Sequence, residues 1–239
     1  MSASIFSSRA AVDFGWREFW VRPWFWLGIV LVFVFVLGLN LLSDRFIPKA
    51  APVQQLIVTL LFMLLNQFLA AGWIRICLNI HDGEAVAFST LFSSFAAGCR
   101  ALLATAFIGL GLVVPAVVIL VFLNLVTNGN MVFLVPAGVI LALALSYVMA
   151  RVIFYVILIV DRGLGAMASL NTCFAMTRGQ VWPIALFWTV IMGVHFLGLL
   201  SLVVGIAVTI PLAMLAKVFV YRKLAAVYFS PAAEIEGAS

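Results

Sequence analysis

Long apolar runs constrain this chain more than any other feature of its sequence. Several of them reach the roughly 20 residues that an α-helix needs to cross a bilayer core about 30 Å thick. Lipid offers no partners to backbone N–H and C=O groups, so such segments must satisfy their hydrogen bonds internally, as helices. The pattern predicts an all-α polytopic bundle of six transmembrane helices. The expected spans cover residues 23–43, 53–76, 101–124, 131–155, 181–199 and 202–222.

The composition excludes an ordinary soluble domain. The 239 residues are 67% hydrophobic and 9% charged, whereas soluble domains are about half apolar and a quarter charged. No soluble core could hide so much apolar surface. The first apolar run, residues 24–42, is longer than the apolar part of a signal peptide, which has about 7–15 residues. We therefore interpret residues 1–239 as one transmembrane domain whose first span is retained.

The basic residues predict the orientation of the spans, because Lys and Arg favour the cytoplasmic side. They gather before the first span and around the loops after the second, fourth and sixth spans, and they comprise Arg9, Arg17, Arg22, Arg75, Arg100, Arg151, Arg162, Arg178, Lys217, Arg222 and Lys223. Only Arg45 and Lys49 lie in the loop after the first span, and the loop "NLVTNGN" has no charge. We expect a bacterial inner-membrane protein with both termini in the cytoplasm. The net charge of +5 predicts contact with anionic lipid, and no loop has the dense basic run that nucleic acid would require.

Three similar segments indicate an internal repeat. They are "AVDFGWREFWVRPW", "FSSFAAGCRALLAT" and "NTCFAMTRGQVWPI", and their glycines, Gly15, Gly98 and Gly179, stand 83 and 81 residues apart. This spacing suits three units, each a short interfacial helix followed by a hairpin of two spans. A basic, aromatic entry point common to all membrane hairpins would explain the similarity equally well. The predicted apolar faces are Val12, Trp16 and Phe19; Phe88, Leu91, Phe92 and Phe95; and Met167, Leu170 and Phe174.

Small residues at helical spacing predict where the spans pack closely. Helices associate in lipid through close backbone approach, which small side chains allow. The predicted packing stripes are Gly138, Ala142, Ser146 and Ala150 in the fourth span and Ser201, Gly205, Thr209 and Ala213 in the sixth.

An arginine inside an apolar segment needs an explanation, because a charged side chain is costly to place there. Arg151 interrupts "SYVMARVIFYVILIV", and Arg75 and Arg222 occupy comparable positions near the ends of other spans. One interpretation is that these side chains extend their guanidinium groups to the lipid head groups and mark the membrane boundary. The apolar stretch after Arg151 would then continue as a helix along or just below the interface. The alternative is an anion-binding site inside the bundle, since intramembrane charge is often functional.

Other polar candidates within the spans are His195, Asn66 and Gln67. A lone membrane histidine could relay protons, but it more often hydrogen-bonds across helices, and the amides are expected to do the same. The predicted spans contain no Asp or Glu that could form a carboxylate relay. "HDGE", residues 81–84, is best interpreted as a turn rather than a metal site. We expect no cofactor, no metal and no catalytic residue, and therefore no enzyme.

The region from Tyr147 onward resembles bacterial polytopic membrane families of unknown function. It is similar to the YciC-like proteins and to the membrane domain found beside some glycerophosphodiester phosphodiesterases. The shared features are Arg151, Asp161, Gly163, the 166–171 helix and the step Thr177-Arg178-Gly179, within residues 135–225. The resemblance implies a multi-span cytoplasmic-membrane protein. No phosphodiesterase domain is present in the chain, so the resemblance implies no catalytic residues.

These observations favour a non-enzymatic envelope scaffold or accessory protein in contact with membrane lipids and a membrane-protein partner. The alternative is a transporter or channel for a small solute or lipid, with Arg151, His195 and Asn66 lining the path. An intramembrane enzyme is a third alternative, for which no pair of nucleophile and base is evident.

Overall fold

The computed structural model describes residues 5–46, 52–128 and 130–230. Every regular element in these ranges is a helix, which confirms the predicted all-α fold. Lys49, expected in the first external loop, lies outside the described residues. The first half contains α1 (Ser8–Val21), α2 (Pro23–Phe46), α3 (Pro52–His81), the 3-10 helix η1 (Phe88–Phe92), α4 (Phe95–Ile108), the π-helical turn η2 (Gly109–Val113) and α5 (Val114–Val126). The second contains α6 (Met131–Val152), α7 (Tyr155–Arg162), α8 (Ala166–Met176), α9 (Val181–Leu200) and α10 (Leu202–Tyr228).

Six stretches in the described residues are long and apolar enough to cross a membrane, which confirms the predicted number of spans. They are Pro23–Ser43, Val53–His81, Phe95–Val126, Met131–Arg162, Val181–Leu200 and Gly205–Tyr228. The main differences from the predicted spans lie at their ends. The second and third stretches are longer than predicted because their helices continue into a protein core that is itself apolar.

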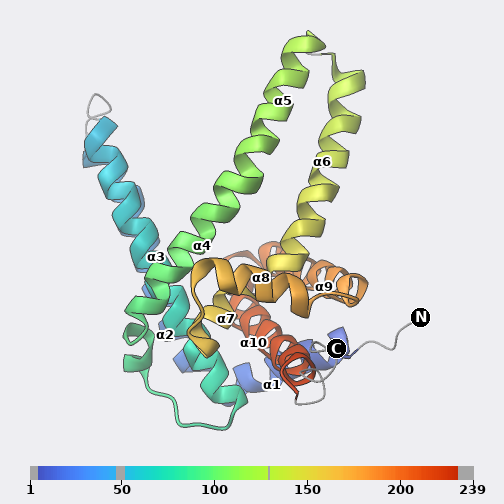
Figure 1. The fold of residues 1–239 in the computed structure, drawn as a ribbon. Coiled ribbons are helices and arrows are strands. Elements are labelled where there is room, and N and C mark those ends of the chain that lie inside the picture. The colour runs from blue at the N-terminus through green and yellow to red at the C-terminus, as the bar shows by residue number, and fades with distance from the viewer. Residues whose placement is uncertain (1–4, 47–51, 129, 231–239) are drawn as a thin grey trace.

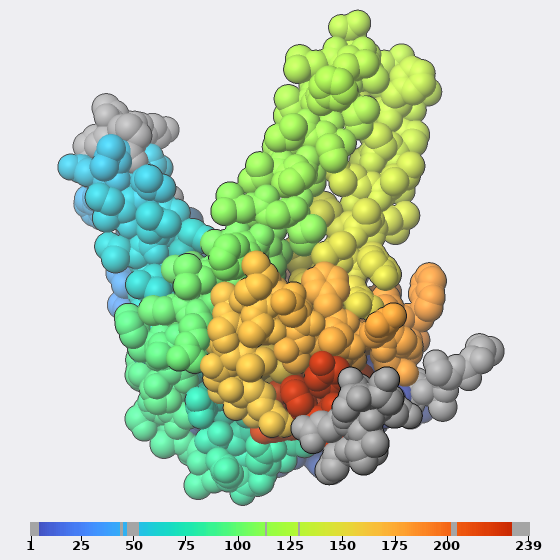
Figure 2. Space-filling view, in the orientation of Figure 1, coloured from blue at the N-terminus to red at the C-terminus, as the bar shows by residue number. Residues whose placement is uncertain are grey.

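The helices form three hairpins that meet in a common base. The hairpins are α2 with α3, α4–α5 with α6, and α9 with α10. We define the base as α1, α7 and α8 together with the parts of α3, α4 and α10 that pack on them. Figure 1 shows the arm of α2 and α3 and the arm of α5 and α6 diverging from this base, and Figure 2 shows the same arms standing apart in the space-filling view.

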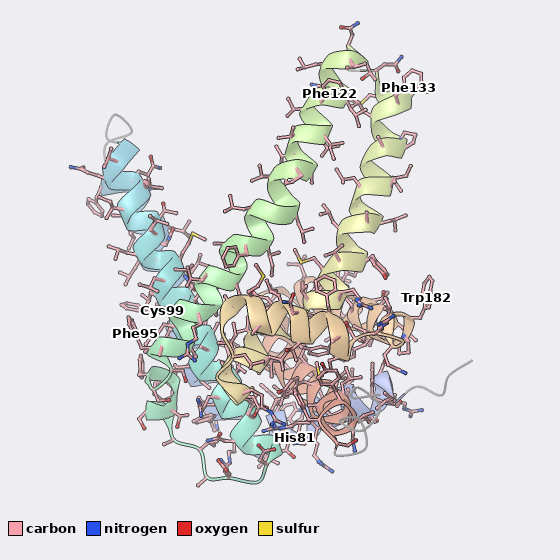
Figure 3. The ribbon with its side chains drawn as sticks, in the orientation of Figure 1. His81, Phe95, Cys99, Phe122, Phe133 and Trp182 are labelled. Atoms are coloured by element: carbon pink, nitrogen blue, oxygen red, sulfur yellow. The ribbon has the colours of Figure 1, made fainter. Side chains whose placement is uncertain are left out.

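The base holds most of the buried core, whereas the arms expose apolar side chains. Phe19, Ile76, Leu158 and Tyr221 are each no more than 2% exposed. By contrast, apolar side chains along α5 and α6 remain largely exposed, as Figure 3 illustrates for Phe122 and Phe133. Exposed apolar surface of this extent suits contact with lipid rather than water.

α7 is the most enclosed helix of the base. Four consecutive residues, Ile157 to Val160, are each no more than 3% exposed, as expected of a helix that is apolar on all sides and buried in protein. The chain turns at Ile153 and Phe154, so α7 does not simply continue α6. The predicted helix after Arg151 is therefore present, and α3, α4 and α8 pack around it. Its position along or just below the interface stays a prediction.

α3 is longer than a bilayer crossing requires. α3 has 30 residues and extends about 45 Å at 1.5 Å per residue, whereas the apolar core of a bilayer is about 30 Å thick. The C-terminal part of α3 carries the buried Trp73, Ile76 and Cys77. The helix is therefore about 15 Å longer than a perpendicular crossing requires, and its C-terminal part packs in the protein core.

The two packing stripes predicted from small residues have different outcomes. A side chain at Gly205 would collide with the backbone of Gly198, and a Cβ at Gly198 would lie 2.6 Å from Thr209 Oγ1, so α9 and α10 touch along this stripe as predicted. On α6 the prediction is wrong, because Ala142 and Ser146 are exposed. A Cβ at Gly138 would meet nothing within 4 Å, and only Ala150 is buried.

The three interfacial segments differ from one another more than the repeat predicts. α1 buries Ala11, Gly15 and Phe19 and exposes Trp16, so Phe19 is the one buried member of the predicted face. The second segment forms only the five-residue η1. α8 buries Leu170 but exposes Met167. The glycines differ too: a Cβ at Gly15 would lie 2.6 Å from Leu212 O and one at Gly98 would lie 2.7 Å from Phe68 Cα, whereas Gly179 occupies a left-handed turn with φ +80°.

Gly205→Leu and Ala142→Leu provide a direct test of this packing. The first should lower thermal stability in detergent by the equivalent of about 1–3 kcal/mol, because the new side chain must separate α9 from α10. The second should change stability by less than about 0.5 kcal/mol, as expected for an exposed position. Equal effects of the two changes would show that the Gly198–Gly205 contact does not hold this hairpin together.

Candidate functional site

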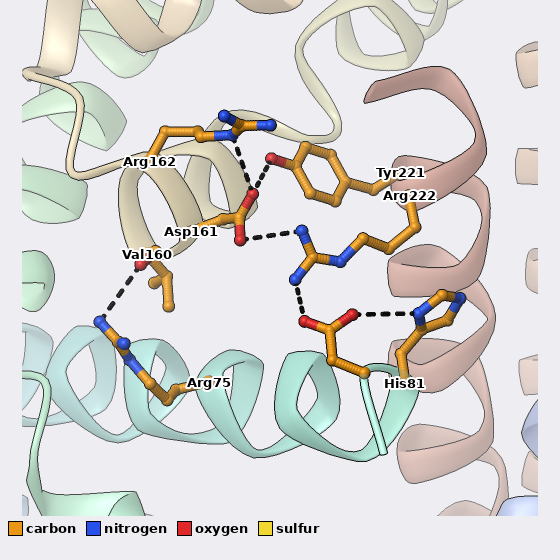
Figure 4. A network of polar contacts seen from close by, with 8 residues as sticks. Arg75, His81, Val160, Asp161, Arg162, Tyr221 and Arg222 are labelled. Carbon is orange, nitrogen blue, oxygen red and sulfur yellow. Dashed lines mark hydrogen bonds and ion pairs between the residues drawn. The ribbon is translucent and has the colours of Figure 1, made fainter. Parts of the chain in front are cut away.

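Asp161, in the last turn of α7, is the centre of a network of charged groups in the base (Figure 4). Its Oδ1 lies 3.0 Å from Nη1 of Arg222, and its Oδ2 accepts a 2.6 Å hydrogen bond from the hydroxyl of Tyr221. The Nε of Arg162 lies 3.3 Å from the same Oδ2. The Asp161 side chain is only 12% exposed, so these partners replace most of the water that an aspartate would otherwise bind.

The network extends from Arg222 to the end of α3. Arg222 Nη2 pairs with Asp82 Oδ2, and Asp82 Oδ1 lies 3.4 Å from His81 Nδ1. Two arginines thus balance two aspartates, and the four charges come from α7, α10 and the residue that follows α3. A neutral arrangement of this kind favours holding helices together over attracting a charged ligand.

Local sequence explains how the two aspartates reach the network. Gly163 ends α7 in a left-handed conformation with φ +65°, and its N–H donates to Ile159 O. This cap stops the helix directly after Asp161 and Arg162. Gly83, with φ +76°, turns the chain after Asp82, which confirms that "HDGE" is a turn. Asp82 additionally contributes a charge to the network.

Arginines also bind the free carbonyl groups at the ends of base helices. Arg75 Nη2 donates to Val160 O at 3.3 Å, and Arg100 Nη1 donates to Gly163 O at 2.8 Å, both at the end of α7. Carbonyls in the last turn of a helix have no partner within the helix and carry its negative dipole end. The arginines therefore satisfy groups that would be costly to bury.

Arg151 has the same role at the end of α8. Its Nη2 donates to Phe174 O at 2.7 Å, its Nη1 lies 3.5 Å from Thr177 O, and its guanidinium lies 5.4 Å from the Phe174 ring. The sequence suggested that Arg151 either extends to the lipid head groups or binds an anion. Neither of these roles includes the observed hydrogen bonds to protein carbonyls. It joins the end of α6 to α8, two elements that are separated in sequence by α7.

Cys173 strengthens the same junction. Its thiol donates to Arg151 O at 3.1 Å, and burial raises its pKa to about 12, although the N–H of Phe154 and the charge of Arg151 oppose the shift. The thiol therefore stays protonated near neutral pH and behaves as a small buried donor rather than as a nucleophile.

The remaining candidates lie elsewhere. Asn66 donates to Phe62 O of its own helix at 3.0 Å and lines a cavity of about 400 Å³ between α2 and α3. His195 is half-buried on α9. Arg75 lies in the base close to the network, whereas Arg151, His195 and Asn66 belong to three different helix pairs. The structure does not bring these three residues together into one path.

Sequence reasoning missed a polar contact that crosses three helices. Gln67 of α3 donates to Thr105 Oγ1 of α4 at 2.9 Å, and that oxygen lies 2.8 Å from the Tyr155 hydroxyl of α7. The expected cross-helix role is confirmed for Gln67 but not for Asn66. Sequence reasoning also left Tyr221 and the pairing of Asp161 with Arg222 unidentified. An acid directly after a buried run and before a glycine was the available signal for Asp161.

A larger cavity of about 620 Å³ lies between α6 and α9. Its walls are Leu143, Ser146, Tyr147, Ala150, Gly179, Val181, Trp182, Ala185, Trp188 and Thr189. Within the described residues, no group of three His, Cys, Asp or Glu side chains could hold a metal ion. No protein-family model, curated protein or solved structure matches the chain.

Asp161→Asn tests whether the network holds the base together. The change leaves Arg222 and Arg162 with a weaker partner and should lower the free energy of unfolding by about 3 kcal/mol, the lower end of the range for a broken buried pair. Asp13→Asn is the matched control, because the Arg9–Asp13 pair is 92% and 72% exposed and should contribute less than about 1 kcal/mol. Similar unfolding curves for both variants would contradict the role of the network.

Arg151→Lys separates helix capping from mere positive charge. Lysine retains the charge but lacks the planar fork that reaches two carbonyls, so the variant should insert normally and lose about 1 kcal/mol of stability. Arg151→Leu should insert as well and lose more, because both carbonyls become unpaired. Full stability of Arg151→Lys would favour the boundary interpretation, and retained stability with loss of a bound anion would favour the anion site.

Proposed function

We propose that the protein is a non-enzymatic scaffold or accessory protein of the bacterial inner membrane. The observation that carries this proposal is the use of charge in the base. Arg222 and Arg162 pair with aspartates, whereas Arg75, Arg100 and Arg151 bind helix-end carbonyls. Arginines with these partners stabilise the packing of the base helices. The exposed apolar arms then provide the surfaces for lipid and for a membrane-protein partner.

The position of the candidate residues supports a scaffold over a transporter. A transport path would require polar groups from several helices to face a common cavity. His195 lines neither the cavity of 620 Å³ nor that of 400 Å³, and Asn66 lines only the latter. The specific feature that favours transport is the polar lining of the smaller cavity by Asn40, Thr59, Asn66 and Gln67.

The residues on which the resemblance to the YciC-like families rests also build the base. Arg151 caps α8, Asp161 centres the network, and Gly163 ends α7. We include this membership in the proposal on those residues. It would place the protein in the cytoplasmic membrane and would assign it no reaction.

The proposed orientation places the base in the cytoplasm with both termini. Arg75, Arg162 and Arg222 belong to the base, whereas Arg45 lies at the opposite end of α2, and basic residues favour the cytoplasmic side. Reporter fusions after Ser239 and within residues 124–130 should therefore report cytoplasm and periplasm, respectively. A periplasmic signal from the C-terminal fusion would contradict the orientation.

Flux through reconstituted protein tests the proposal against its alternative. Liposomes that contain the purified chain and a pH-sensitive dye are exposed to an imposed membrane potential. The change of internal pH should equal that of protein-free liposomes, because a scaffold offers no path for protons. Counterflow of a panel of radiolabelled solutes should likewise stay at the protein-free level. Flux that rises with protein and falls in Asn66→Ala or His195→Ala would overturn the scaffold proposal and establish the transporter.

A further inference from the structure

The smaller cavity, between α2 and α3, has polar walls although the arm around it is apolar. Its volume of about 400 Å³ lies within the 300–1,000 Å³ typical of ligand pockets, which combine an apolar lining with a few polar groups. Half of its lining residues are polar and none of them is charged. The polar residues are Asn40 of α2 and Thr59, Asn66 and Gln67 of α3. The rings of Phe33 and Phe62 contribute apolar wall from the same two helices.

The three amides of this cavity keep hydrogen-bonding groups that the protein does not use. Asn66 donates one N–H to its own helix at 3.0 Å, and Gln67 donates one to α4 at 2.9 Å. Among the described residues, no donor pairs with Asn66 Oδ1 or Gln67 Oε1, and nothing pairs with the side-chain amide of Asn40. Gln67 Oε1 and the Asn40 amide are accessible rather than sealed inside the protein, and Asn66 is exposed. An occupant of the cavity can therefore reach all three.

The cavity lies at the depth of the hydrocarbon core and opens toward lipid. Asn40 stands 3 residues inside the end of the apolar stretch Pro23–Ser43, and Asn66 stands 13 residues inside the start of Val53–His81. At 1.5 Å per residue these positions are about 5 Å and about 20 Å from the outer end of the arm. Thr59 and Met63, which also line the cavity, are exposed on the surface of α3. Polar groups at this depth are costly without partners, because lipid chains offer none.

We propose that this cavity binds an uncharged lipid whose head carries hydroxyl groups. The occupant is uncharged because no lining residue could balance a phosphate or an ammonium taken out of water. A hydroxyl both donates and accepts, so it donates to Asn66 Oδ1 or Gln67 Oε1 and accepts from the Asn40 amide. The occupant comes from the bilayer because the opening faces lipid, and its acyl chains lie along the exposed apolar side chains of the arm. This site goes beyond the scaffold role and requires no transport.

Diacylglycerol, phosphatidylglycerol and free glycerol separate the chemistry of the occupant from its source. The full chain is purified in mild detergent, and bound molecules are counted by native mass spectrometry during titration with each probe. Wild-type protein should retain one diacylglycerol, with at least tenfold preference over phosphatidylglycerol, because the phosphate would enter an uncharged cavity. Free glycerol at the same concentration should not displace it. Equal binding of the two lipids would overturn the uncharged occupant, and displacement by glycerol would overturn the lipid source.

Two variants remove an amide from opposite walls, so that a folding defect in one does not decide the result. Asn40→Leu acts from α2 and Asn66→Leu from α3, and leucine is favourable within a membrane span. Each should weaken diacylglycerol binding about fivefold, which is the loss expected for one neutral hydrogen bond. Asn124→Leu is the matched control, because Asn124 is an exposed amide of α5 that does not line the cavity. Wild-type binding by both cavity variants, or an equal loss in Asn124→Leu, would overturn the proposal.

Discussion

The ion pair between Asp161 and Arg222 is the contact on which the rest of the structure depends. It joins α7 to α10 at 3.0 Å, and Arg222 continues to Asp82 beyond α3. Through Arg222, these two pairs connect α7 to α10 and to the end of α3, and so link two of the three hairpins to the base. In lipid, apolar surfaces gain little by meeting one another, and Figure 1 shows the two arms diverging from the base. The base therefore supplies the interactions that the arms do not.

The base also explains why an arginine stands inside an apolar stretch. The residues after Arg151 form α7, which other helices of the base enclose. The carbonyl groups in the last turn of such a helix have no partner within the helix, and they need donors. Arg75 and Arg100 serve the end of α7, and Arg151 serves the end of α8. Charge in this protein is placed where helices end inside the protein.

Much of the fold could be predicted from the sequence, because the lengths and positions of apolar runs follow directly from the thickness of a bilayer. The Gly198–Gly205 contact was foreseen in part, since small residues are needed wherever two backbones meet. The stripe on α6 failed because spacing does not reveal whether a neighbour is present. The break between α6 and α7 at Ile153 and Phe154 was not foreseen, because a run of valine and isoleucine does not reveal where a helix turns. The pairing of Asp161 with Arg222 joins residues far apart in the chain, and no local pattern encodes it.

A double-mutant cycle on Asp161 and Arg222 tests the central claim most directly. The free energy of unfolding in mixed micelles is measured for the wild type, Asp161→Asn, Arg222→Gln and the double variant. If the pair joins α7 to α10 as described, the sum of the two single losses of stability should exceed the loss in the double variant by about 1.5–3 kcal/mol, in the upper part of the range for residues in direct contact. A coupling within about 0.5 kcal/mol of zero would show that the two residues act independently and that the base is held together by apolar packing alone.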